Sequence, residues 1–92
     1  MTLVQLGEQV AMQLASFADA ARQRGMEPVS CVVGGRQLEA LMAWARAAHG
    51  DRMIWRIEIN GLPVWRDDRD HHLEIECIHG RGTDRLEARL RA

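Results

Sequence analysis

Several residue types are missing from this chain or scarce in it. Its 92 residues include no tyrosine, one phenylalanine, two prolines and two cysteines. All twelve basic residues are arginine, so every cationic side chain is a planar guanidinium that stays charged. Two cysteines cannot form a disulfide framework. We expect Cys31 and Cys77 to be buried thiols within strands, with a disulfide between adjacent strands as the alternative.

An excess of charge of one sign is also missing. The formal net charge is −1, whereas nucleic-acid-binding domains usually show a basic excess, so nucleic acid is not an expected partner. No apolar run approaches the roughly 20 residues that span a bilayer, and no signal-peptide pattern begins the chain. Apolar residues make up 47%, which suffices for a core. We therefore expect one domain over residues 1–92, located in the cytoplasm and not associated with a membrane.

The segment 54–66 has the clearest structural pattern. Asn60-Gly61 separates two runs rich in β-branched and aromatic residues, which is typical of a tight hairpin because both turn residues tolerate positive φ. Alternation places an apolar stripe on one face and leaves Trp65 on the other. Pro63 has no N–H, so the second strand is either an edge there or has an outer neighbour that stops short of it.

The remaining periodicities predict a small two-layer α+β domain. Thr2 and Gln5 fit a capping box at the start of a long helix, and Glu27-Pro28 is expected to break the chain. We expect residues 29–33 to run parallel to residues 53–59 in a βαβ unit, within a sheet of three or four strands packed on two main helices. The expected order is helix 2–24, strand 29–33, helix 36–48, the two hairpin strands, strand 72–78 and a short helix 84–91.

One candidate site is a metal centre on the last strand. His72, Glu74 and Glu76 share a strand face, and imidazole and carboxylate groups can hold a divalent ion. The spacing matches no specific ligand pattern, and a solvated strand face after an acidic loop has the same appearance. No cofactor is expected.

A second candidate is an anion site at Gly34, Gly35 and Arg36. These residues lie between a strand and the start of a helix, where free N–H groups attract anions. The same glycines can simply make the turn. Serine occurs only at Ser16 and Ser30, and no nucleophile has a recognisable catalytic context, so we expect no enzyme activity.

A third candidate is a protein-binding surface rich in tryptophan and arginine, the residue types that dominate interface hot spots. Trp65 is its centre because it falls on the hairpin face opposite the apolar stripe; the alternative is burial of Trp65 under a helix. An edge near Pro63 could also accept an added strand. The proposed contact residues are Trp65, Arg56, Arg66, Arg69 and Trp44.

The helix predicted over residues 2–24 is a fourth candidate. Its apolar residues recur at spacings of three and four, close to a heptad pattern. Such a stripe can face the core of its own domain or pair with a second copy to form a homodimer.

Two stretches of this sequence resemble segments of known proteins. SCVVGGRQLEALMAWA followed by INGLPVWRDD, within residues 30–70, is similar to segments of bacteriophage structural and accessory proteins, including tailed-phage capsid proteins. The resemblance implies a phage or prophage origin and carries over no functional residue. We expect a non-catalytic protein-binding module, such as an accessory or inhibitor protein that occupies a host partner's surface. The alternatives are a structural subunit of a larger assembly and a small metal- or anion-binding enzyme.

Overall fold

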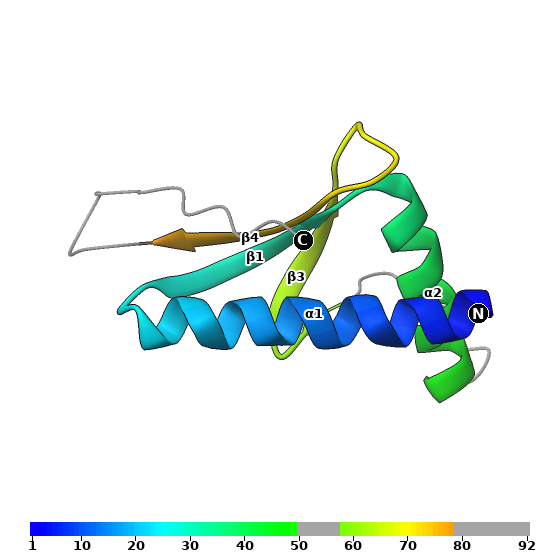
Figure 1. The fold of residues 1–92 in the computed structure, drawn as a ribbon, viewed down its shortest axis with the longest axis horizontal. Coiled ribbons are helices and arrows are strands. Elements are labelled where there is room, and N and C mark those ends of the chain that lie inside the picture. The colour runs from blue at the N-terminus through cyan, green and yellow to red at the C-terminus, as the bar shows by residue number, and fades with distance from the viewer. Residues whose placement is uncertain (50–57, 79–92) are drawn as a thin grey trace.

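The computed structural model describes residues 1–49 and 58–78, and these form an α+β fold (Figure 1). Two helices pack against a four-stranded mixed sheet, as the sequence predicts. The predicted helix 84–91 lies outside the described residues. The elements are α1 (Leu3–Gln23), β1 (Glu27–Val33), α2 (Gly35–His49), β2 (Glu58–Ile59), β3 (Leu62–Arg66) and β4 (Leu73–Ile78).

The first helix begins as the sequence predicts. The Thr2 side chain accepts a hydrogen bond from the Gln5 N–H at 3.1 Å, and Gln5 Oε1 accepts one from the Thr2 N–H at 2.8 Å. This reciprocal pair satisfies two amides that no helical carbonyl can reach. Gly25 ends the helix with φ of +78°, a conformation that glycine adopts without steric cost. Within residues 1–49 and 58–78, no helix combines the length and apolar character needed to cross a bilayer.

The sheet is arranged around β1. Its strand order is β2-β3-β1-β4, so β1 has a hydrogen-bonded neighbour on each side. It runs parallel to β3, with Cys31 opposite Val64, and antiparallel to β4, with Cys31 opposite Ile75. Helix α1 lies along one face of this sheet, and α2 crosses the N-terminal part of α1 (Figure 1).

The predicted βαβ pairing is wrong in one respect. The parallel neighbour of β1 is the second hairpin arm, Leu62–Arg66, and not the first arm, which is described at Glu58–Ile59 and lies at the sheet edge. Both arms direct apolar side chains to the same face, so the pattern could not select the inner arm. The expected break at Glu27-Pro28 is also wrong, since both residues begin β1 and a register shift follows Pro28.

The hairpin turn itself is confirmed. Asn60 and Gly61 have φ of +50° and +81°, and the turn brings Ile59 opposite Leu62. Pro63 pairs with Glu58, while the parallel pairing with β1 starts at Val64. The pairing with β1 therefore begins one residue after the proline that lacks an N–H, although β1 itself continues past it to Glu27. Residues 54–57 of the predicted hairpin lie outside the described residues.

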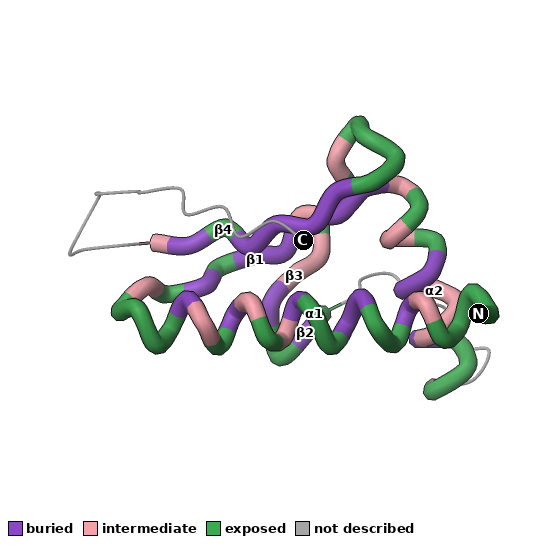
Figure 2. The backbone as a smooth tube through the Cα atoms, viewed as in Figure 1, coloured by how far each residue is buried: buried purple, intermediate pink, exposed green. Residues whose placement is uncertain are grey.

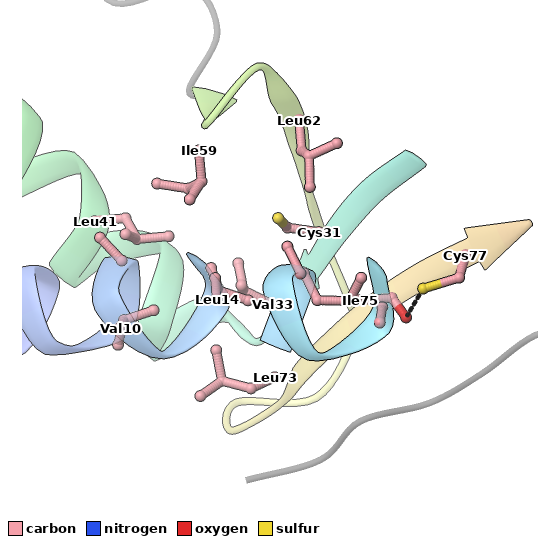
Figure 3. Packing of buried hydrophobic residues seen from close by; sticks show 13 residues of the cluster. Val10, Leu14, Cys31, Val33, Leu41, Ile59, Leu62, Leu73, Ile75 and Cys77 are labelled. Carbon is pink, nitrogen blue, oxygen red and sulfur yellow. Dashed lines mark hydrogen bonds between the residues drawn. The ribbon is translucent and has the colours of Figure 1, made fainter. Parts of the chain in front are cut away.

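The core lies between α1, α2 and one face of the sheet (Figure 3). Leu14, Val33 and Ile75 are fully enclosed there, which follows from the alternation of β1 and β4 and the helical stripe of α1. Both cysteines are buried free thiols, as predicted. Burial raises the pKa of the Cys31 thiol to about 11 and raises that of Cys77 as well. These thiols therefore stay protonated and act as small apolar groups.

The two helices come close together at Gly7. A Cβ atom built there would lie 2.0 Å from the Ala40 carbonyl oxygen and 2.6 Å from Trp44 Cβ. The absence of a side chain thus lets α1 and α2 come into backbone contact and seats Trp44 against the core.

We expect Gly7→Ala to destabilise the protein by about 1–3 kcal/mol, because the added methyl forces the helices apart. The substitution otherwise favours a helix, so a loss of stability separates packing from propensity. Chemical denaturation measures the change. Ser16→Ala, at an exposed position of α1, is the control and should stay within about 0.5 kcal/mol. A Gly7→Ala protein as stable as wild type would contradict the close crossing.

Candidate functional site

The sheet face turned away from α1 is called here the outer face. Because side chains alternate along each strand, the residues between the core positions of β1, β3 and β4 project to this side. The register places Trp65 and Glu74 on either side of Val32, and Ser30 beside Glu76. The outer face consists of Ser30, Val32, Trp65, Glu74 and Glu76.

Trp65 is the large apolar residue of this face. Its exposed fraction is 57%, although it sits within a strand and opposite Val32. Trp44, by contrast, is half-buried and packs against the core cluster. Helix α1 therefore does not bury Trp65, and the last helix, the other element that could cover it, lies outside the described residues.

A fork-like ion pair lies beyond the end of β3. Arg69 Nε and Nη2 donate to the two carboxylate oxygens of Asp67 at 2.9 and 3.2 Å, and the Arg69 N–H donates to Oδ1 at 2.9 Å. These bonds favour the ionised carboxyl, so Arg69 holds the pKa of Asp67 well below its usual range. Asp67 in turn raises the pKa of Arg69. The pair braces the segment 67–72, called here the 67–72 loop.

The loop connects to a buried histidine–carboxylate pair. His72 Nε2 lies 3.3 Å from Glu74 Oε1 and 3.3 Å from Arg69 Nη2. One ring nitrogen carries either a lone pair or a proton, so Nε2 can accept from Arg69 or donate to Glu74 but not do both. His72 and Glu74 are only 8% and 7% exposed. The predicted solvated strand face is therefore wrong at these two positions.

The predicted metal ligands do not converge. Glu76 accepts a hydrogen bond from Ser30 Oγ at 2.7 Å, while Glu74 lies against His72. Among residues 1–49 and 58–78, no group of three or more histidine, cysteine, aspartate or glutamate side chains is placed to hold a metal ion. The Ser30 hydroxyl thus faces a carboxylate and not a histidine base, and Cys31 is enclosed in the core.

The predicted anion site is occupied by the protein itself. The N–H groups of Gly34, Gly35 and Arg36 donate to the carbonyl oxygens of His72, Arg69 and Asp70 at 2.9, 3.0 and 2.9 Å. A Cβ atom at Gly34 would lie 2.5 Å from the Asp70 oxygen, so glycine is needed for this approach. These amides cap the start of α2 with the 67–72 loop, and they are not available to a bound anion.

The structure separates the five residues predicted to form one protein-binding surface. Trp65 lies on the outer face, and Arg69 lies beside His72 at its rim. Arg66 points to the opposite side, where its guanidinium lies over Gly35. Trp44 belongs to the contact between the helices, and Arg56 lies outside the described residues. The place of Arg56 in this surface therefore stays a prediction.

No known protein family, curated protein or solved structure matches this chain in the three comparisons. The resemblance to phage proteins stays a prediction. The fold and the described side chains thus carry the functional argument.

The sequence indicates a polar loop over residues 67–70 but not its organisation. The available signal is an aspartate two residues before an arginine, which can bind both its backbone and its side chain. The sequence analysis missed Gln37; its Oε1 accepts the His72 N–H at 3.2 Å and ties the loop to α2. No local pattern indicates this contact, because 35 positions separate its partners.

The Asp67–Arg69 pair predicts an acid dependence of stability. The pKa of Asp67 is lowered on folding, so the unfolded chain takes up the proton first and stability falls as the pH falls. We expect the free energy of unfolding of the wild type to decline from about pH 5 downward more steeply than that of Asp67→Asn. Urea titrations at a series of pH values measure this difference.

Asp68→Asn is the matched control. It removes a carboxylate from the same exposed loop but leaves the Asp67–Arg69 pair intact. Its acid dependence should follow the wild type. Equal pH profiles for wild type and Asp67→Asn would show that the pair does not contribute to folding.

Proposed function

We propose that this protein is a non-catalytic protein-binding module whose outer face docks on a partner. The observation that carries the proposal is the 57% exposure of Trp65 in the middle of a sheet strand. Val32 extends the apolar area next to it, while the exposed Arg69 supplies a polar group at one end, above the buried His72–Glu74 pair. An aromatic anchor beside satisfied polar groups is the usual composition of an interface centre.

The free energy gained by covering the exposed indole supports a docking role for this face. Covering the exposed part of an indole on association contributes roughly 2–3 kcal/mol from apolar area alone. The sheet beneath it is rigid, because β3 is hydrogen-bonded to β1 over Val64–Arg66. A preformed strand loses little conformational entropy on binding, so most of that gain remains available.

The proposal includes the biological setting that the sequence resemblance implies. A phage-encoded accessory or inhibitor protein in the host cytoplasm would act by covering a host protein's surface. Such a role requires a stable small scaffold and an exposed anchor, and it requires no catalytic group.

The proposal is tested by measuring how the substitution Trp65→Ala changes the affinity for the partner. A quantitative affinity capture from the native host identifies the partner, and titration of that partner with the purified protein gives the dissociation constant. We expect Trp65→Ala to weaken it about 30-fold or more, as at hot-spot residues. The same binding by wild type and Trp65→Ala would rule out this face.

Met12→Ala is the control for that experiment. Met12 is 65% exposed on α1, away from the outer face, and its truncation removes comparable apolar exposure without touching β3. Its affinity should equal that of the wild type, and circular dichroism should show that both variants remain folded.

A second candidate function is self-assembly through α1. Figure 2 shows that α1 is buried along the side that faces the sheet and exposed on the opposite side. Met12 is exposed away from the buried stripe, while Leu3 and Val4 are exposed at the N-terminal end of the helix. A groove of about 380 Å³ lies beside Met12, with Trp44 and Ile59 in its wall. A second copy packed here would cover these apolar groups and would make the chain a structural subunit or homodimer.

Light scattering coupled to size-exclusion chromatography tests this second candidate. If α1 forms the contact, the wild type should elute as a defined oligomer and Met12→Glu as a monomer, because a buried unpaired carboxylate opposes association. Trp65→Ala should keep the oligomer. A monomeric wild type at high concentration would exclude self-assembly through α1.

A further inference from the structure

A second surface lies on the side of the sheet opposite Trp65, at the start of α2. A groove of about 630 Å³ opens between the first turns of α2, the end of β3 and the 67–72 loop. It stands at the carboxyl ends of the parallel strands β1 and β3, where α2 begins. In open α/β sheets this is the position at which ligands bind.

Two guanidinium groups line this groove from different elements. Arg36 comes from the first turn of α2 and Arg66 from the end of β3. The Arg66 Nη2 atom lies 3.2 Å from the position that a Gly35 Cβ atom would take, so the side chain rests on the glycine at the helix start. Neither guanidinium forms an ion pair with any residue that the structure describes.

A third donor is fixed by a hydrogen-bond relay. Gln37 Oε1 accepts the His72 N–H, which leaves the Gln37 amide nitrogen facing His71 Nδ1 at 3.3 Å. An amide NH₂ can only donate, so Nδ1 is the acceptor and the hydrogen of the neutral ring is on Nε2. His71 lines the same groove, and Nε2–H is the donor that its ring retains for a ligand.

The rest of the lining is mixed. Leu38 and Met42 form an apolar wall along α2, while Glu39 and Asp70 bring two carboxylates. The paired charges make the groove formally neutral, so a ligand is selected by the directed donors and not by a general positive field. The guanidinium fork matches the geometry of a carboxylate or phosphate, which favours an acidic group there.

We propose that this groove binds the oxyanion group, carboxylate or phosphate, of a small organic anion through Arg36, Arg66 and His71. The carbon part of the ligand lies along Leu38 and Met42. This site is separate from the outer face and does not depend on the protein-binding proposal. It also differs from the anion site expected at the α2 amides, since those amides are already bonded to the 67–72 loop.

Titrations of the full chain followed by amide NMR test the proposal. The probes are inorganic phosphate and hexanoate, added at constant ionic strength so that general screening does not change. We expect saturable shifts centred on Gly35, Arg36 and His71 with at least one probe, and the tighter probe identifies the preferred oxyanion. Shifts that do not saturate, or that centre elsewhere, would overturn the proposal.

Two variants that should change the affinity in opposite directions make the test specific. Arg66→Gln should weaken binding about tenfold or more by removing a charged donor, and Glu39→Gln should strengthen it by removing a repelling carboxylate. Arg22→Gln, which breaks only the exposed pair with Asp19 on α1, should leave the affinity unchanged. Equal affinities for wild type and Arg66→Gln, both folded by circular dichroism, would show that no site is built there.

Discussion

The main-chain hydrogen bonds between the start of α2 and the 67–72 loop are the constraint on which the rest of this structure depends. Three successive amides, at Gly34, Gly35 and Arg36, donate to carbonyls of the loop. They satisfy donors that the first turn of a helix leaves open, and they hold the connection from β3 to β4 against the end of β1. The loop can come this close to Gly34 because glycine has no side chain; a larger residue there would force the loop away.

The hydrogen bonds between the α2 amides and the 67–72 loop position residues of both candidate surfaces. On one side, the fixed loop presents Arg69 to Asp67 and to His72, which sets the polar end of the outer face beside Trp65. On the other side, the same loop forms a wall of the groove that holds Arg36 and His71. Alternation along β3 then assigns neighbours in sequence to different surfaces, so Trp65 and Arg66 cannot serve one partner through the same face.

The buried polar groups that the structure describes are all engaged within the protein. The hydroxyl of Ser30 is bonded to Glu76, and the Cys31 thiol is enclosed with a raised pKa. In the described part of the chain, every buried side-chain nitrogen or oxygen has a hydrogen-bond partner. Satisfied polar groups of this kind stabilise a scaffold, because none of them carries an uncompensated cost of desolvation.

The sequence by itself determined the local structure. The Thr2–Gln5 box and the positive-φ turn at Asn60-Gly61 each depend on neighbours within a few residues, and both are confirmed. Only the tertiary structure decided which hairpin arm pairs with β1, that the α2 amides bond to the 67–72 loop, and that His72 and Glu74 are buried. The first two outcomes join residues 30 or more positions apart, and both hairpin arms carry the same apolar pattern, so no local preference could determine them.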